Sequence, residues 1–346
     1  MKAIVRTQPG PPSVLRLDPS YPKPAPKAGH IIIRVNAIGL NRAELRSRNG
    51  DPPAKPEFTS DDLYTETPPA ILGEECVGIA DDNGGSEVIR KGDTVAAYFC
   101  GIGKAFDGAY AEYTRVPARY VFTLSTTLPW GLLGAIPSTF MTAYGSLFRA
   151  LHIRPHDSVL VHGGTSSVGT AAIMLAKLEG CKVAATTRQK SKVDSLRQIG
   201  AKAVLIDGGD ESLSKQLKAH ETFKDGVDHV LELVGPDRIA DAWACAKPFA
   251  TVCITGVLTK VWALDKWSPA EGIETGKKLT TYQSARDLNS ESLGEGMAKL
   301  VKDVEDGKID VKGGIGLTLN GLESIIKGHE EMEADRVTGK IVIVLD

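Results

Sequence analysis

The sequence predicts an α/β protein made of a β-rich part and a doubly wound parallel sheet. Its 346 residues suggest about two domains. The first third contains short strand-like runs separated by glycine turns, and from about Ser138 strands alternate with helices. Hydrophobic residues at 42% and charged residues at 24% are typical of a globular chain, which argues against a disordered or disulfide-scaffold protein.

The first third is expected to form a small barrel. Residues 31–38, 76–80 and 93–97 have the composition of β-strands, and glycine turns lie between such runs. Residues 49–69 carry five prolines and little periodicity, so they are predicted to form a long loop. Tyr64 in this loop is expected either to cap a cleft or to lie exposed.

The second half is expected to form the nucleotide-binding part of the protein. Apolar runs predict strands at residues 158–162, 182–186, 203–206, 229–233 and 251–254. Helical spacing at 168–178 and 191–199 falls between them, and this alternation predicts a parallel sheet. Helices are expected at 293–304 and 321–333, and a last strand at 340–344 is expected to return to the first domain.

The charge balance excludes several classes of partner. Lys and Arg number 41 and Asp and Glu number 43, a formal net charge of −2, which argues against a nucleic-acid or anionic-membrane surface. A small-molecule substrate is therefore the expected partner. No signal-peptide or membrane-spanning run is visible, and the five cysteines are scattered singly, so a cytoplasmic protein with reduced thiols is expected.

The strongest local motif follows the strand at 158–162. Gly164 to Gly169 reads G-x-S-x-x-G and opens a helix, which places free N–H groups and the positive helix end where a pyrophosphate binds. Ser166 stands where the usual fingerprint has its second glycine, and its hydroxyl is expected to donate to the phosphate. The alternative is a plain tight turn between strand and helix.

The end of the next strand favours NADPH over NADH. An acidic residue there would accept hydrogen bonds from the adenosine ribose and repel a 2′-phosphate. Thr187 and Arg188 occupy this place instead and are followed by Lys190 and Lys192, so hydroxyls and cations are expected to meet the phosphate. The alternative is a solvated, basic start of a helix.

No metal site is predicted. The seven histidines form no HxxxH or CxxH pair, and the five cysteines have no ligand spacing. Each histidine is expected to be a surface residue or a core residue with its hydrogen bonds satisfied.

Modest motifs follow one another along nearly the whole chain. They are Ala37-Ile38-Gly39-Leu40-Asn41, Leu72-Gly73-Glu74-Glu75-Cys76-Val77-Gly78, Lys91-Gly92-Asp93-Thr94-Val95, Asp107-Gly108-Ala109-Tyr110-Ala111-Glu112-Tyr113 and Gly339-Lys340-Ile341-Val342. In this order they resemble the medium-chain dehydrogenase/reductase superfamily, and within it the zinc-free NADPH:quinone oxidoreductase branch that includes zeta-crystallin.

The resemblance implies a GroES-like catalytic domain from residues 1–127 and 269–346, a Rossmann domain at 128–268, substrate binding in the cleft and a homodimer. Zinc members of the superfamily have a cysteine near the position of Asn41 and a histidine in the motif matching Glu74. Without a Lewis acid, the enzyme is better matched to acceptors that delocalise charge, which are quinones and α,β-unsaturated carbonyls. Two alternatives stay open: an enoyl reductase of a natural-product pathway and a low-turnover NADPH-binding protein.

The resemblance also assigns site residues. Asn41 and Thr142 are expected beside the nicotinamide and are the catalytic candidates. The expected cofactor contacts are Asn41, Thr142, Gly164, Ser166, Ser167, Val168, Thr187, Arg188, Lys192, Leu233, Gly235, Thr255, Gly256 and Val257. Residues 265–283, with Trp267 and Tyr282, are expected to line the dimer interface or the cleft, or to form a surface connection.

Overall fold

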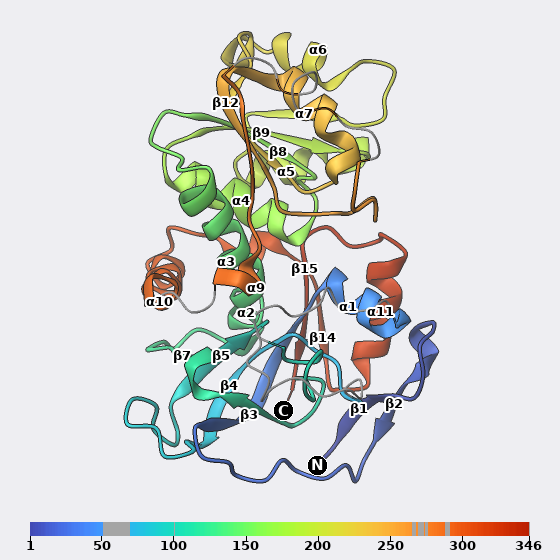
Figure 1. The fold of residues 1–346 in the computed structure, drawn as a ribbon, viewed down its shortest axis with the longest axis vertical. Helices are drawn as coiled ribbons and strands as arrows, with labels where there is room; N and C mark the ends of the chain where they lie inside the picture. Colours follow the sequence, from blue (N-terminus) through green and yellow to red (C-terminus); the bar gives the residue numbers. More distant parts are fainter. Residues whose placement is uncertain are drawn as a thin grey trace. The chain divides into compact units, whose positions relative to one another are not determined.

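The computed structural model describes residues 1–50, 70–99, 101–264, 268, 273, 276–287 and 291–345. The chain divides into two compact units (Figure 1). Unit 1 contains residues 1–141, 284–306 and 315–346, and unit 2 contains residues 142–283 and 307–314. Tyr64, Trp267 and the predicted loop beyond Gly50 lie outside the described residues.

Unit 1 is built on a seven-stranded sheet with the order β14-β15-β3-β4-β5-β7, in which β6 pairs with β3 off this path. The strands are β3 (His30–Leu40), β4 (Glu75–Asp82), β5 (Thr94–Tyr98), β6 (Tyr113–Pro117), β7 (Val121–Thr123), β14 (Ile315–Asn320) and β15 (Lys340–Val344). β15 pairs antiparallel with β3, from Ile341 opposite Leu40 to Val344 opposite Ala37. The prediction that the last strand returns to the first domain is therefore confirmed.

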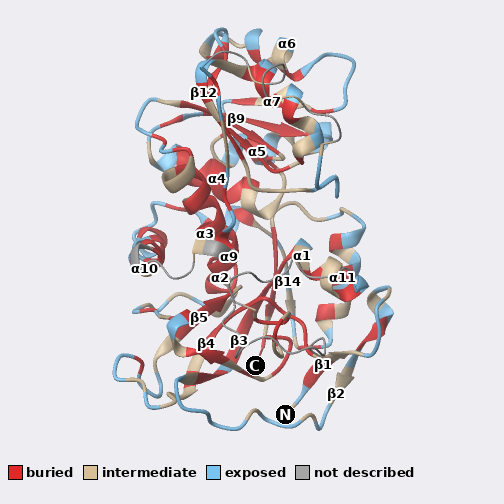
Figure 2. Cartoon of the chain, viewed as in Figure 1, coloured by how far each residue is buried: buried red, intermediate tan, exposed pale blue. Residues whose placement is uncertain are grey.

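The remaining elements of unit 1 surround this sheet. A two-stranded sheet pairs β1 (Ala3–Arg6) with β2 (Leu15–Asp18). The helices are α1 (Arg42–Asn49), α2 (Trp130–Leu133), α9 (Ser284–Asp287), α10 (Glu291–Glu305) and α11 (Ser324–Glu333), with short 3₁₀ turns η1 (Pro12–Val14) and η2 (Ala118–Tyr120). α11 packs on β3, β14 and β15. The central strand β3 is buried along almost its whole length, which explains its long apolar sequence (Figure 2).

Unit 2 contains six parallel strands in the order β10-β9-β8-β11-β12-β13. They are β8 (Ser158–His162), β9 (Lys182–Thr187), β10 (Ala203–Ile206), β11 (Val227–Glu232), β12 (Ala246–Ile254) and β13 (Lys278–Thr281). Numbered within the sheet, this order is 3-2-1-4-5-6, which is the order of a Rossmann fold. The predicted fold class is confirmed for both parts of the protein.

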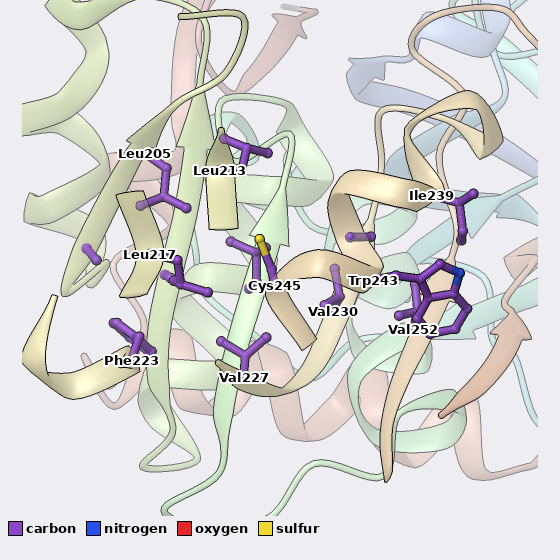
Figure 3. Close-up of a cluster of buried hydrophobic side chains, with 14 residues drawn as sticks. Leu205, Leu213, Leu217, Phe223, Val227, Val230, Ile239, Trp243, Cys245 and Val252 are labelled. Carbon is purple, nitrogen blue, oxygen red and sulfur yellow. The ribbon is translucent and has the colours of Figure 1, made fainter. Parts of the chain in front are cut away.

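Helices cover the parallel sheet. They are α4 (Ser167–Leu178), α5 (Val193–Ile199), α6 (Leu213–Lys218) and α7 (Ile239–Cys245), with short turns η3 (Gly145–Ala150), η4 (Lys190–Lys192), η5 (Glu221–Phe223), η6 (Pro236–Arg238) and η7 (Val311–Gly314). α4 and α5 pack on β8, β9 and β10, while α6 and α7 pack on β10, β11 and β12. Leu217, Phe223, Val230 and Trp243 belong to the buried apolar cluster that joins α6 and α7 to the strands (Figure 3).

Both boundaries between the units lie at higher residue numbers than those that the sequence suggested, which were 127/128 and 268/269. The first boundary falls inside α3 (Pro137–Tyr144), and the second falls after residue 283. α2, which precedes α3, packs on β3, β4 and β15, so it belongs to unit 1. The second boundary is late because residues 278–281 form β13, a strand that pairs with β12. Among the described residues, no helix combines the length and apolar character needed to cross a membrane.

Candidate functional site

The turn between β8 and α4 leaves backbone donors unused. Gly163 N donates to Thr186 Oγ1 at 2.9 Å, and Gly164 N donates to the carbonyl of Thr186 at 3.1 Å. Within the described part of the chain, the amides of Thr165, Ser167 and Val168 donate no hydrogen bond. Three free N–H groups at the start of a 12-residue helix form an anion site, and this fits the pyrophosphate of a dinucleotide.

The Ser166 hydroxyl is engaged within the turn, and its expected contact with a phosphate stays a prediction. Ser166 is the N-cap of α4: its Oγ donates to the carbonyl of Gly163 at 2.8 Å and accepts from Gly169 N at 3.0 Å. Its one hydroxyl proton is therefore used inside the turn in this structure. Ser166 acts on this site by holding the helix start in place.

Two glycines make the close packing of this turn possible. A Cβ at Gly169 would lie 2.4 Å from the carbonyl oxygen of Gly163, and backbone atoms of Gly164 would be 2.9 Å away. Gly163 has φ of +92°, a conformation that residues with a side chain rarely adopt. Gly169 therefore lets the first turn of α4 pack closely against the backbone of the turn, and Gly163 gives the turn its conformation.

The carboxyl end of β9 presents cations, but its threonine hydroxyls face inward. Thr187 is 3% exposed, and its Oγ1 donates to the carbonyl of Gln189 at 3.3 Å and accepts from Gln189 N at 3.1 Å. The expectation that this hydroxyl meets a phosphate is thus not supported. Arg188 and Lys190 are exposed and Lys192 is partly exposed, so the positive charge that a 2′-phosphate needs is present at this strand end.

The loops that follow β11 and β12 lie beside the turn. A Cβ on Gly163 would contact Leu233, Val234 and Leu258, all within 3.5 Å. Gly256 N donates to the carbonyl of Glu232 at 3.2 Å. The structure therefore brings three predicted segments together at one edge of the sheet: the turn, the loop with Leu233 and Gly235, and the loop with Thr255, Gly256 and Val257.

A serine that the sequence analysis missed links Thr142 to this edge. Ser146 Oγ donates to the carbonyl of Thr142 at 2.7 Å and lies 2.9 Å from Thr255 Oγ1. Because Ser146 has one hydroxyl proton, Thr255 donates to Ser146. Thr142 is 8% exposed. Thr142 and Thr255 thus belong to one hydrogen-bonded group, and their contact with a cofactor stays a prediction.

A buried charged cluster lies at the same ends of the strands. His162 Nδ1 is 2.6 Å from Glu232 Oε2, and His162 Nε2 is 3.4 Å from Asp207 Oδ2. Burial alone would lower the pKa of His162, but the hydrogen bonds to Asp207 and Glu232 outweigh it and raise the pKa to about 9. We refer to His162, Glu232 and Asp207 as the histidine cluster. His162 is thus a core histidine with satisfied hydrogen bonds, as expected.

Asn41 lies in a second buried polar group, in unit 1. Its Nδ2 donates to the carbonyl of Gly39 at 3.2 Å and to Glu75 Oε1 at 2.9 Å. Its Oδ1 accepts from Lys340 Nζ at 2.8 Å and from Ser138 Oγ at 3.0 Å. Lys340 Nζ also donates to Glu75 Oε1 at 2.5 Å. We refer to Asn41, Glu75, Ser138 and Lys340 as the Asn41 cluster.

The Asn41 cluster orients the Asn41 amide within the protein. All four hydrogen-bonding positions of the amide have partners, and the residue is 8% exposed. Gly39 makes room for this arrangement, because a Cβ there would lie 2.5 Å from Lys340 Cε. Asn41 is therefore held rigidly, and the nicotinamide contact assigned to it stays a prediction.

Further buried acids of unit 1 lie next to the Asn41 cluster. Glu44 accepts from Asn41 N at 2.7 Å, from Glu74 N at 2.8 Å and from the hydroxyl of Tyr110 at 2.6 Å. Burial raises the pKa of Glu44 to about 7, and the nearby carboxylate of Glu74 adds to the rise. The Tyr110 hydroxyl is also 2.8 Å from His329 Nε2. Tyr110 is completely buried.

The sequence analysis missed the ionisable partners in both clusters. Lys340, Glu75 and Glu232 each lie at the end of or inside an apolar strand run, where a charge needs a partner. A charged residue in an apolar strand run predicts a buried ion pair, because Lys and Glu are almost never fully buried unless they are paired. It does not identify the partner, since Lys340 and Asn41 are 299 residues apart in the chain.

A Rossmann sheet whose first strand-to-helix turn has free amides, joined in one chain to a β-rich GroES-like unit, defines an NAD(P)-dependent oxidoreductase fold. Residues 27–126 match the family described as alcohol dehydrogenase GroES-like domain, and residues 167–284 match the family described as zinc-binding dehydrogenase. The chain belongs to the medium-chain dehydrogenase/reductase superfamily, which is the predicted family.

Individual relatives agree with this assignment. Quinone oxidoreductase of Pongo abelii is 30% identical over 235 residues, which cover 68% of this chain and 66% of that protein. Prostaglandin reductase-3 of Mus musculus is 27% identical over 96% of this chain and 88% of that protein. The structure of Escherichia coli quinone oxidoreductase complexed with NADPH has a TM-score of 0.81 at 21% identity, covering 99% of this chain and all of that one. This last likeness concerns the fold.

The residues present do not fit the zinc that the name of one matching family implies. The resemblance puts the cysteine of the zinc members near the position of Asn41 and their histidine in the motif matching Glu74, and the Asn41 amide is saturated by partners that include the ammonium group of Lys340. Across the described residues, no group of three His, Cys, Asp or Glu side chains is arranged to hold a metal. A cation at Asn41 would be repelled by Lys340 and would have to displace an existing hydrogen bond.

Proposed function

We propose that the protein is an NADPH-dependent reductase that transfers a hydride, without metal, to a quinone or an α,β-unsaturated carbonyl. The observation that carries this proposal is the hydrogen bond from Lys340 to Asn41. It puts an amide and an ammonium group near the place where the resemblance puts a zinc ligand of the superfamily. A reductase without a Lewis acid is suited to acceptors that spread negative charge over a conjugated system.

The residues of unit 2 fit NADPH. The free amides of Thr165, Ser167 and Val168 would hold the pyrophosphate, and Arg188 and Lys192 would bind the 2′-phosphate. When bound, NADPH supplies a hydride. The names of the relatives, a quinone oxidoreductase and a prostaglandin reductase, support the same class of acceptor.

The experiment that tests the proposal is a measurement of NADPH and NADH oxidation with ortho-quinone, para-quinone and enone acceptors, using chelator-treated protein. We expect oxidation of NADPH that survives chelation, and the order of acceptor rates then narrows the substrate class. Activity that disappears with the chelator and returns with zinc would contradict the metal-free reaction. Tight NADPH binding without oxidation by any acceptor would instead favour a low-turnover binding protein.

Arg188→Ala tests the choice of cofactor. We expect this substitution to weaken NADPH binding by about 1.5–3 kcal/mol and to leave NADH binding nearly unchanged, because only NADPH carries the 2′-phosphate. Titration calorimetry with each cofactor measures both values. Arg197→Ala on α5 is the matched control, since Arg197 is an exposed arginine paired with Asp194. An equal loss for both cofactors would show that Arg188 does not read the phosphate.

A further inference from the structure

The histidine cluster joins three strands at the edge of the sheet where the cofactor is proposed to bind. His162 ends β8, Glu232 ends β11 and Asp207 follows β10. The side chains of His162 and Glu232 are completely buried, and that of Asp207 is 8% exposed. Two carboxylates at this depth need a compensating positive charge, and His162 lies between them.

Asp207 is close to the proposed 2′-phosphate site. The strand pairing puts Ile206 opposite Thr187, and Asp207 N donates to the carbonyl of Thr187 at 2.9 Å. Asp207 and Arg188 are therefore the residues that directly follow two paired strands, β10 and β9. The positive charge of Arg188 contributes to a lowered pKa of Asp207, after the larger effects of His162 and of Arg238. An acid beside Arg188 would weaken the binding of a phosphate unless its charge were offset.

Two cationic side chains offset the negative charge of the Asp207 carboxylate. Its Oδ2 faces His162 Nε2 at 3.4 Å, and its Oδ1 accepts from Arg238 Nη2 at 3.3 Å. Arg238 is partly exposed, whereas His162 is shielded from solvent and salt, so the charge of His162 is the less screened of the two.

We propose that His162, as an imidazolium, is a specificity-determining residue that favours NADPH over NADH. It does so by neutralising the charge of Asp207, which follows the strand paired with the one that precedes Arg188. This inference rests on the proposed use of NADPH. His162 acts through Asp207 and does not touch the cofactor, so it is a positioning residue for charge. Glu232 has a separate role, because its Oε1 accepts from Val234 N at 2.7 Å and Gly235 N at 3.1 Å and holds the loop after β11.

The test compares the dissociation constants of NADPH and NADH, measured by titration calorimetry on the full chain. His162→Asn removes the charge but keeps an amide donor near Glu232, and His162→Gln keeps a donor on the side of Asp207. We expect each variant to lower the preference for NADPH about tenfold, the effect of one buried charge near a doubly charged phosphate. NADH binding should change much less, which also shows that the variant is folded.

A charge-balanced double variant separates electrostatics from packing. His162→Asn combined with Asp207→Asn removes one positive and one negative charge, so the preference for NADPH should return to within about twofold of the original. His229→Asn is the matched control, since His229 lies in β11 and bonds to Asp157 at 3.2 Å, outside the histidine cluster. Its ratio of constants should stay unchanged.

The other possible results of these titrations contradict either the role of His162 or the proposed use of NADPH. If the unmodified protein prefers NADPH but the His162 variants keep that preference, this inference is wrong and the proposed function stands. An equal loss for both cofactors, or a double variant that fails to recover, would assign His162 a structural role only. If the unmodified protein binds NADH as tightly as NADPH, both the proposed cofactor and this inference are wrong.

Discussion

Lys340→Met is expected to lower the free energy of unfolding by about 3–5 kcal/mol, because it leaves a buried carboxylate without its counter-charge. The side chain of Lys340 is 1% exposed and that of Glu75 is completely buried. Glu75 would keep hydrogen bonds from Asn41 and from the backbone of Ser138, at 2.9 and 2.8 Å, but it would lose the one ion pair that it has among the described residues.

Urea unfolding followed by circular dichroism measures this effect. Lys302→Met is the matched control: Lys302 is exposed and pairs with Asp306 at 3.3 Å, so its loss should cost less than about 1 kcal/mol. Adding Glu75→Gln to Lys340→Met should recover part of the stability, since the uncompensated charge is then removed. A loss below about 1 kcal/mol for Lys340→Met would mean that the Asn41 cluster contributes little to the stability of unit 1.

Gly169→Ala is expected to raise the dissociation constant of NADPH at least about 100-fold, or about 2.7 kcal/mol. The new Cβ would lie 2.4 Å from the carbonyl oxygen of Gly163, and the neighbouring atoms are backbone that cannot rotate away. The turn must shift, and with it the free amides of Ser167 and Val168. NADH should lose as much, because both cofactors share the pyrophosphate.

Gly209→Ala provides the control for a glycine substitution in the same unit. A Cβ at Gly209 would meet Ile206 at 3.6 Å, an ordinary contact. Its cofactor binding should match that of the unmodified protein in the same titration. Unchanged binding in Gly169→Ala would show that the pyrophosphate does not lie against this turn.

Most of the parallel sheet could be predicted because its strands are short apolar runs with clear ends. β8, β10 and β15 have the predicted boundaries: β8 and β15 are apolar runs that are almost fully buried, and β10 is a short apolar run between Lys202 and Asp207. β13 was missed because its four residues, Lys278–Thr281, are exposed or only half-buried at the edge of the sheet. β14 was missed as well, since it begins Ile315-Gly316 and is not fully buried at any position.

The parts of the site that depend on backbone conformation could be predicted from the sequence. The parts that depend on which partner a side chain bonds to were harder to predict. The pattern around Gly163 and Gly169 correctly predicted a strand, a tight turn and a helix. It did not predict that Ser166 would cap α4, because a serine hydroxyl serves a helix start or a phosphate equally well. The Asn41 cluster depends on pairing between the two ends of the chain, which local patterns do not contain.

The position of Lys340 in the chain affects how the protein is made. Unit 2 is formed mainly by one continuous stretch, so its contacts can form as soon as that stretch has left the ribosome. Unit 1 cannot be completed then, because β15 and its lysine are synthesised after unit 2. Until that moment Glu75 has no Lys340 to face, and β3 lacks one neighbouring strand. We therefore expect chains that end before β15 to expose the edge of β3 and to aggregate more readily than the full chain.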